Sequence, residues 1–242
     1  MTKTAIIIPS RLNAQRLPNK PLKLINKKEM ILHVYDAAIN AKAGEVYVAS
    51  PDKEIIETVI NYGGKAIKTS ADHETGTDRV YEVFEKKLNC IPEIIINLQG
   101  DMPNIKSEAI SKLVTYMSNN KCDIATLASD LKSKSELENV NVVKVALNEK
   151  LTSSIFLSAL DFFRANSKTL NLYHHVGIYA FTKQALIRYV SLSRSKLEIE
   201  RKLEQLRALE NDMSIHVGYI NSYPLSVDTK EDFEEIKRLM EK

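Results

Sequence analysis

Short apolar segments alternate with amphipathic ones through the first 120 residues of this chain. Ala5–Ile8 is apolar at every position, which is typical of a strand buried on both faces of a sheet. The next segment, Glu29–Lys42, has its apolar residues at the spacing of one helical face. The same order of strand and helix occurs four times in this region, which predicts an α/β fold with a mostly parallel central sheet.

The remaining elements follow from the same patterns. The other predicted strands of the first half are Glu45–Ala49, Lys65–Lys68 and Ile94–Leu98, and the other helices Glu54–Tyr62, Thr77–Lys87 and Ser107–Asn119. The second half is more mixed, with predicted strands Ile124–Ala128, Val142–Leu147, Ser153–Leu157, Val176–Phe181 and Ser214–Gly218, and helices Gln184–Leu192, Lys196–Asn211 and Lys230–Glu241. We expect one domain over residues 1–242, with an antiparallel excursion near 130–182 that could serve as a lid or a dimer surface.

Composition excludes several classes of protein. The hydrophobic fraction of 44% and charged fraction of 27% are ordinary for a globular chain, and 7 Gly and 7 Pro argue against low-complexity linkers. The sequence lacks the apolar core of a signal peptide and the run of about 18 apolar residues that a membrane span needs. Cys90 and Cys122 form no CxxC pair, so we expect reduced core thiols in a cytoplasmic protein.

Positive charge is concentrated at the N-terminal end. The net charge of +3 is too small to indicate a nucleic-acid partner, yet the first 28 residues contain seven cations and no acid. One interpretation is a solvated basic end of the chain. The other is an anion-binding site near the N-terminus.

The loop that follows the first strand, Pro9–Leu22, contains Arg11, Arg16 and Lys20 at spacings of five and four. Arg forks and Lys ammonium groups bind phosphate oxygens. The loop matches neither GxxxxGK[ST] nor GxGxxG, so neither a P-loop nor a dinucleotide dehydrogenase is indicated. We interpret it as a phosphate-binding loop, with a basic surface turn as the alternative.

Two carboxylates have positions that suit a metal ion. Asp101 directly follows the strand Ile94–Leu98 between Gly100 and Pro103, and ligands in such sheets bind beyond the C-terminal ends of the strands. Mg²⁺ takes one or two protein carboxylates and completes its shell with water and substrate phosphates. Asp228 also follows a short apolar stretch. The alternatives are a helix or turn cap for Asp101 and a helix N-cap, with Glu231 at N3, for Asp228.

Several motifs occur in a particular order. They are Ile8-Pro9-Ser10-Arg11, Arg16-Leu17-Pro18-Asn19-Lys20-Pro21-Leu22, Ala71-Asp72-His73-Glu74-Thr75-Gly76-Thr77-Asp78-Arg79, Asn97-Leu98-Gln99-Gly100-Asp101, His175-Val176-Gly177-Ile178-Tyr179, Leu203-Glu204-Gln205-Leu206-Arg207-Ala208-Leu209-Glu210 and Val227-Asp228-Thr229. With these motifs the chain resembles, over nearly its whole length, the CMP-KDO synthetases, the 3-deoxy-manno-octulosonate cytidylyltransferases of lipopolysaccharide synthesis.

The resemblance implies a Rossmann-like nucleotidyltransferase fold, usually a homodimer, that joins CTP to KDO and releases pyrophosphate. It implies that catalysis depends on Arg11, Lys20, Asp101 and Asp228, with Mg²⁺ held by Asp101 and Asp228. The implied nucleotide-binding residues are Ser10, Arg11, Arg16, Lys20, Ala71, Thr75, Gly76, Thr77 and Gln99. The implied residues for the sugar and other anionic ligands are Arg79, His175, Tyr179, Glu204 and Gln205. From the residues alone, His175 and Tyr179 could instead be structural and Glu204 solvated.

The chain departs from the family pattern at two positions. Met102 stands where a Glu is common, and Ala159 stands where the family has the Arg of a Phe-Ser-Arg motif; Arg164 could partly substitute. Three alternatives to KDO activation therefore stay open. They are a cytidylyltransferase for 8-amino-KDO, one for sialic acid, and a non-catalytic CTP-binding derivative.

Overall fold

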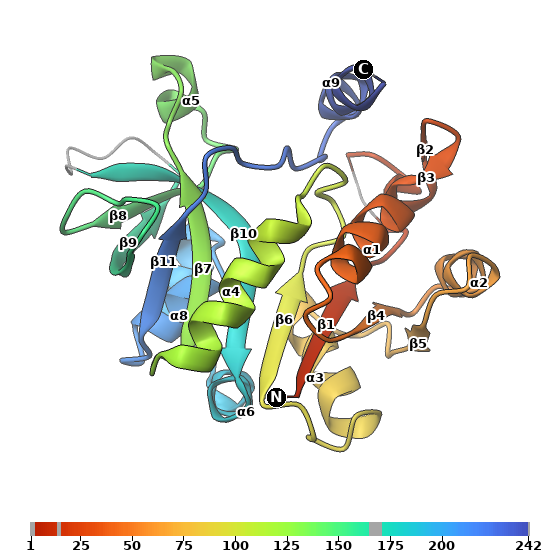
Figure 1. Cartoon of the computed structure of the whole chain (residues 1–242), viewed down its shortest axis with the longest axis horizontal. Helices are drawn as coiled ribbons and strands as arrows, with labels where there is room; N and C mark the ends of the chain where they lie inside the picture. Colours follow the sequence, from red (N-terminus) through yellow and green to blue (C-terminus); the bar gives the residue numbers. More distant parts are fainter. Residues whose placement is uncertain (1–2, 14–15, 165–170, 242) are drawn as a thin grey trace. The chain divides into compact units, whose positions relative to one another are not determined.

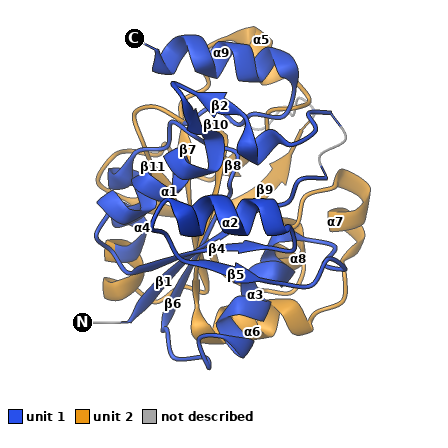
Figure 2. Ribbon diagram, turned by 90° about the vertical axis from the view of Figure 1, so that its right-hand side faces the viewer, with its two compact units in different colours: residues 1–114, 224–242 blue, residues 115–223 orange. Residues whose placement is uncertain are grey.

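The computed structural model describes residues 3–13, 16–164 and 171–241. They fall into two compact units, which Figure 2 shows in separate colours. Unit 1 comprises Met1–Val114 and Pro224–Lys242, and unit 2 comprises Thr115–Tyr223. Among the described residues, no helix is long and apolar enough to cross a membrane.

Unit 1 is built on a parallel sheet, as the alternating pattern predicted. Its strands are β1 (Thr4–Pro9), β4 (Glu45–Ser50), β5 (Ala66–Lys68) and β6 (Ile94–Leu98), in the order β5-β4-β1-β6 (Figure 1). Every residue of β1 and β6 is buried, because protein covers both faces of these two strands. A parallel strand in this position is apolar throughout for that reason.

Unit 1 also contains helices, most of which lie between these strands in the sequence. They are α1 (Met30–Asn40), α2 (Lys53–Asn61), α3 (Gly76–Lys86), α9 (Lys230–Met240) and the 3₁₀ helix η1 (Lys20–Leu22), and the short strands β2 (Leu24–Ile25) and β3 (Lys28–Glu29) form a separate ribbon. Helix α4 (Ser107–Asn119) runs from unit 1 into unit 2.

The C-terminal helix α9 packs against the N-terminal segment of the chain. Phe233 and Ile236 of α9 are buried in one apolar cluster with Leu17 of the basic loop Pro9–Leu22. Val227, which precedes α9, belongs to the same cluster, together with Ile25 and Met30. The basic loop is therefore fixed at Leu17 by apolar contacts while its cations stay outside the cluster.

The described part of unit 2 contains five strands whose pairings close into a ring. They are β7 (Ile124–Ser129), β8 (Lys144–Leu147), β9 (Phe156–Phe163), β10 (Leu172–Thr182) and β11 (Ile215–Tyr219). Strand β7 pairs with β10 and β11, β11 with β9, β9 with β8, and β8 with β10. All but the β7–β11 pair are antiparallel, which agrees with the predicted antiparallel character of this half.

The helices of unit 2 include one that was predicted wrongly. The described helices of unit 2 are α5 (Lys134–Glu138), α6 (Lys183–Ser191), α7 (Lys196–Arg201) and α8 (Gln205–Leu209). Helices α7 and α8 replace the single helix expected over Lys196–Asn211. Lys202 interrupts that helix with a left-handed backbone, φ 54°. The break returns α8 towards α7, so that buried Arg207 forms two hydrogen bonds with buried Glu198, at 2.8 and 2.6 Å. An apolar period does not reveal such a pair, and Ile199 of the expected apolar stripe is exposed.

The predicted excursion near residues 130–182 contains α5, β8, β9 and β10, and its residues 165–170 lie outside the described part. Its role as a lid or dimer surface, and the prediction of a single domain, remain predictions. Cys90 and Cys122 are both free thiols; Cys122 is buried, whereas Cys90 is only half-buried and so does not belong to the core.

Gly218 of β11 provides a test of the packing in unit 2. A Cβ at this position would overlap the ring of Phe156, which stacks on Tyr116 with ring centroids 3.7 Å apart. Gly218→Ala should therefore lower the free energy of unfolding by about 1–3 kcal/mol, measured by urea denaturation. The smaller side chain of Phe156→Leu should recover part of that loss in the double variant. Additive effects of the two substitutions would contradict this packing.

Candidate active site

The carboxyl ends of three parallel strands of unit 1 reach the same edge of its sheet. Pro9 of β1 lies beside Ala49 of β4, and Ile7 of β1 lies beside Asn97 of β6. The segments that follow these strands therefore leave the sheet together, which is where ligands bind in such folds. Asp52, after β4, accepts a hydrogen bond from the backbone N–H of Leu12 at 2.7 Å and so fixes the start of the basic loop.

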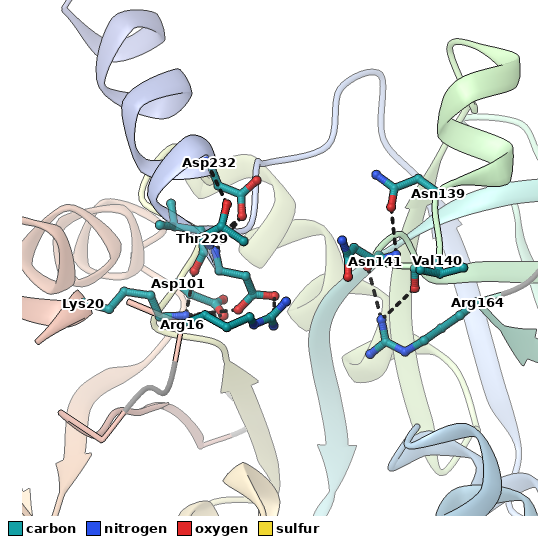
Figure 3. A network of polar contacts seen from close by, with 11 residues as sticks. Arg16, Lys20, Asp101, Asn139, Val140, Asn141, Arg164, Thr229 and Asp232 are labelled. Atoms are coloured by element: carbon teal, nitrogen blue, oxygen red, sulfur yellow. Dashed lines mark hydrogen bonds and ion pairs between the residues drawn. The ribbon is translucent and has the colours of Figure 1, made fainter. Parts of the chain in front are cut away.

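Lys20 of the basic loop joins the two predicted metal-binding carboxylates (Figure 3). Its Nζ donates to the carbonyl oxygen of Val227 at 2.6 Å, and lies 3.3 Å from Asp101 Oδ2 and 3.4 Å from Asp228 Oδ1. Arg16 Nη2 lies 3.1 Å from Asp228 Oδ2. Two cations of the basic loop and two carboxylates thus form one cluster, although residues 20 and 228 are far apart in the sequence.

The alternative interpretation of Asp228 as a helix N-cap is wrong. Thr229 is the N-cap of α9, and Asp232, not Glu231, is its N3 partner in a capping box. The Asp232 carboxylate accepts from the backbone N–H groups of Asp228 and Thr229, at 3.0 and 2.8 Å. The capping box of Thr229 and Asp232 (Figure 3) therefore fixes the Asp228 backbone, and the Asp228 carboxylate pairs with Arg16 and Lys20.

Asp101 does not cap a helix, since α4 begins only at Ser107. Its backbone carbonyl accepts from the N–H of Val227 at 2.9 Å, which holds the segment after β6 against the segment before α9. A second link runs from the Leu225 N–H to Asn104 Oδ1 at 3.0 Å. These backbone contacts fix the two carboxylate-bearing segments relative to each other within unit 1.

The residues expected to hold the nucleotide include a polar chain at the start of α3. Gln99 Nε2 donates to Asn97 Oδ1 at 3.0 Å, and Asn97 Nδ2 donates to the Thr77 hydroxyl at 3.1 Å. A Cβ at Gly76 would lie 3.6 Å from the Gln99 amide, so Gly76 and Gln99 are immediate neighbours. Thr75 is the N-cap of α3 in a capping box with Asp78.

Two side chains of α3 form hydrogen bonds with the loop between β5 and α3. Buried Arg79 donates through Nη1 to the Thr69 hydroxyl and, at 2.7 Å, to the Ser70 carbonyl oxygen. Burial lowers the pKa of Arg79, and the positive charge of Arg11 lowers it further. Glu82 accepts from the Ser70 N–H at 2.9 Å and pairs with His73. Arg79 thus stabilises the loop through its hydrogen bonds to Thr69 and Ser70. A direct contact of Arg79 with an anionic ligand remains a prediction.

Ser10 and Ala71 complete the unit 1 residues predicted to bind the nucleotide. Ser10 is buried and continues the β1–β4 pairing, because its N–H donates to the Ala49 carbonyl oxygen at 2.9 Å. Ala71 and Arg11 are exposed.

His175 of unit 2 pairs with Ala128 just before a β-bulge of β10, which falls between Val176 and Tyr179. Thr126 Oγ1 lies 2.7 Å from the Ile178 carbonyl oxygen and 3.1 Å from that of Val176, and 2.9 Å from His175 Nε2. Because the one hydroxyl proton goes to a carbonyl, His175 Nε2 is the donor to Thr126 and Nδ1 carries the lone pair. Burial lowers the pKa of His175 to about 3, so the ring is neutral at physiological pH.

Tyr179 and Glu204 lie close to each other in unit 2. The Tyr179 ring is 5.4 Å from that of His175, and burial, followed by the nearby charge of Glu204, raises its pKa. The Glu204 carbonyl accepts from the Tyr189 hydroxyl at 2.9 Å, which fixes the start of α8. Gln205, the first residue of α8, is buried. Four of the five residues that the resemblance implied for the sugar and other anionic ligands therefore belong to unit 2, where Tyr179 lies close to both His175 and Glu204, whereas Arg79 belongs to unit 1.

The positions that depart from the family pattern have distinct surroundings. Met102 is buried, and Ala159 lies within β9 opposite Leu147. Arg164 Nη1 donates to the carbonyl oxygens of Val140 and Asn141 at 3.4 and 3.2 Å (Figure 3). The positive charge of Arg164 is also close enough to lower the pKa of Tyr179 against the effect of burial.

Sequence reasoning missed four contributors to this architecture. They are the Val227 carbonyl, the Asp52 carboxylate, the Thr229–Asp232 capping box and the apolar cluster of Leu17 with Phe233 and Ile236. Asp52 could have been found, because it follows a predicted strand of the same sheet edge. The Thr229–Asp232 capping box could also have been found, because Thr and Asp three residues apart form a local helix-start pattern. The other two depend on where α9 docks, and no local pattern shows that.

The protein offers only a few ligands to a metal ion at this site, so water or substrate oxygens would have to complete the coordination shell. Within residues 3–13, 16–164 and 171–241, no group of three or more His, Cys, Asp or Glu could hold an ion. Asp101 and Asp228 provide carboxylate oxygens, and Val227 a carbonyl oxygen, around a single point. These are hard ligands of the kind that Mg²⁺ prefers, in the small number that it takes when phosphates complete its shell.

Comparisons with known proteins agree on one family. The cytidylyltransferase family matches residues 5–215. Proteins named 3-deoxy-manno-octulosonate cytidylyltransferase from Rhodopseudomonas palustris (strain BisB5) and Brucella canis are each 43% identical to the chain, over 98% and 97% of it and 97% and 94% of their own length. A solved structure of CMP:2-keto-3-deoxy-manno-octonic acid synthetase complexed with CTP is 36% identical, covers 99% of both chains and has a TM-score of 0.89.

The neutral state of His175 predicts a pH dependence of stability. Its pKa is about 3 in the folded protein against 6.5 as the ordinary value, so unfolding takes up a proton between these values. The free energy of unfolding should therefore fall below pH 6.5, with His175 contributing about 1.4 kcal/mol per pH unit. Denaturant unfolding at pH 7.5, 6.5, 5.5 and 5.0 measures this.

His175→Gln should flatten that slope by about one proton between pH 6.5 and 5.0. The amide can still donate to Thr126, which makes it a suitable replacement. An unchanged slope in His175→Gln would show that the imidazole titrates normally in the folded protein.

Proposed function

The chain belongs to the cytidylyltransferase family, among the 3-deoxy-manno-octulosonate cytidylyltransferases, and from this premise we propose that it transfers CMP from CTP to 3-deoxy-D-manno-octulosonate (KDO). The products are CMP-KDO and pyrophosphate, and the reaction activates KDO for lipopolysaccharide synthesis. The observation that carries the proposal is the convergence of Asp101 and Asp228 on Lys20 of the basic loop.

The reaction joins two anions. The anomeric hydroxyl oxygen of KDO attacks the α-phosphorus of CTP, the bond from that phosphorus to the bridging oxygen breaks, and pyrophosphate leaves. The hydroxyl proton is released. Repulsion between the sugar carboxylate and the triphosphate opposes the approach, so neutralisation and alignment of the two substrates contribute most to the rate.

The cations of the basic loop suit this task in the proposed reaction. Lys20 and Arg16 are held on Asp101 and Asp228 and can exchange these partners for phosphate oxygens. Arg11 adds a third positive charge near Arg79. Gln99 and Gly76, at the start of α3, are proposed to contact the nucleoside, together with Ser10, Ala71, Thr75 and Thr77.

We assign Mg²⁺ to Asp101 and Asp228. When bound there, the ion would neutralise triphosphate charge and polarise the phosphorus under attack. The protein itself contributes the fixed direction of the two carboxylates, which follows from the contact of Asp101 with Val227 and from the capping box at Thr229.

The sugar is proposed to bind to the unit 2 residues His175, Tyr179, Glu204 and Gln205. Since His175 is neutral and donates through Nε2 to Thr126, its Nδ1 lone pair can accept a sugar hydroxyl. The family Arg is replaced by Ala159, and we propose that Arg164 provides the cation for the sugar carboxylate. Arg164 donates to the carbonyl oxygens of Val140 and Asn141, which are neutral groups and do not cancel its charge.

Two further properties belong to this proposal. We propose a homodimer, as the resemblance implies. We also place the reaction in the cytoplasm, because CTP is an intracellular nucleotide and both cysteines are free thiols.

Pyrophosphate release from CTP and fresh KDO tests the proposal. Release should require Mg²⁺, and KDO should react faster than 8-amino-KDO or sialic acid. If pyrophosphate is released faster with 8-amino-KDO or sialic acid, that acid is the substrate in place of KDO. CTP binding without release from any acid would indicate a non-catalytic derivative.

In the same assay, Asp101→Asn and Asp228→Asn should each reduce turnover by two orders of magnitude or more, since each removes a carboxylate from the proposed metal. Asp212→Asn is the matched control, because Asp212 is exposed and its left-handed backbone, φ 54°, suits Asn equally well. Near-normal turnover of either variant at low Mg²⁺ would contradict the metal assignment.

A further inference from the structure

The ammonium group of Lys20 occupies the point at which the two carboxylates converge. Its three oxygen partners come from three distant segments: Val227 O at 2.6 Å, Asp101 Oδ2 at 3.3 Å and Asp228 Oδ1 at 3.4 Å. An ammonium has three N–H donors, so this set accounts for all of them. The Lys20 side chain is only 14% exposed and therefore lies inside the cluster.

A divalent cation on the same carboxylates would need the same oxygens. It would also lie within a few ångströms of the ammonium, and because the Lys20 side chain is only 14% exposed, water screens the repulsion between the two positive centres incompletely. Arg16, on the other oxygen of Asp228, adds a second positive charge. The four charges of Arg16, Lys20, Asp101 and Asp228 cancel one another, so the cluster attracts an incoming cation only weakly.

A triphosphate changes this balance. Its oxygens offer new acceptors to the ammonium of Lys20, whose flexible four-carbon stem allows it to change partner. The same oxygens provide ligands that two protein carboxylates lack. Departure of Lys20 towards the phosphates would free Asp101 and Asp228 at the moment when the metal can complete its shell.

We propose that Lys20 is an internal cation that holds the carboxylate pair until the triphosphate arrives, so that the divalent cation enters this site with the nucleotide and not before it. This inference rests on the proposed function, because it takes Asp101 and Asp228 as metal ligands. It adds an order of binding: the unliganded protein has low affinity for the metal alone. Lys20 thereby also keeps the two carboxylates at their converging positions before the substrates bind.

Binding of Mn²⁺ alone tests the proposal without any turnover. The electron paramagnetic resonance signal of free aqueous Mn²⁺ falls as the ion binds, which gives a Kd for each variant. Lys20→Met removes the charge and keeps an unbranched side chain, and should bind Mn²⁺ at least tenfold more tightly than the wild type. Lys20→Arg, which keeps the charge, should stay as weak as the wild type.

Two controls separate this effect from a general loss of positive charge. Lys106→Met removes an exposed cation of unit 1 and should leave the Kd for Mn²⁺ unchanged. Lys20→Met combined with Asp101→Asn should lose the gain. If Lys20→Met does not fold, by circular dichroism, Lys20→Gln takes its place in the same series.

Two outcomes would overturn the proposal and differ in what they imply. If Lys20→Met binds Mn²⁺ no more tightly than Lys106→Met, although Asp101→Asn still weakens binding in the presence of CTP, Lys20 does not compete and the metal assignment survives. If Asp101→Asn changes Mn²⁺ binding in neither the Lys20→Met protein nor the CTP complex, the metal does not use this pair. The metal assignment of the proposed function then fails as well.

Discussion

The ammonium of Lys20, held by Val227, Asp101 and Asp228, is the interaction on which the architecture of unit 1 converges. It connects the first loop of the chain to the segment after β6 and to the segment before α9. The backbones of the partners are held by other contacts: Asp101 and Val227 by their mutual backbone hydrogen bond, and Asp228 by the capping box of α9. Because these contacts hold the backbone of Asp101, Val227 and Asp228, the charged side chains can exchange partners while the backbone keeps its fold.

Apolar packing explains why the basic loop can carry so much charge and still be ordered at Lys20. Leu17 is buried in the same cluster as Phe233 and Ile236 of α9, and Val227 belongs to it too. The residues on either side of the site are thus anchored by one set of buried side chains. Unit 2 follows a similar principle with polar groups, since Thr126 fills the β-bulge of β10 and orients His175.

Much of unit 1 was predictable from the sequence, because its parallel strands are wholly apolar and its helices amphipathic. The position of Asp101 followed from the end of β6, and the clustering of cations indicated an anion site. The predictions that failed did so for two reasons, one tertiary and one local. Lys196–Asn211 has an apolar period, yet the pair of Glu198 with Arg207 breaks it into two helices. Thr229 rather than Asp228 caps α9, because the Asp232 carboxylate reaches the backbone of both residues. Val227 and Lys20 are 207 residues apart in the sequence, so no local pattern predicts that they lie in contact.

We propose that the carboxylates of Asp101 and Asp228 exchange the Lys20 ammonium for a divalent cation when the nucleotide binds. Anomalous diffraction from Mn²⁺ in crystals grown with CTP tests it most directly. We predict an anomalous peak within coordination distance of both Asp101 and Asp228, with the Lys20 ammonium moved onto a triphosphate oxygen. A complex in which Lys20 still contacts Val227 and both carboxylates, with the Mn²⁺ peak elsewhere, would contradict the account.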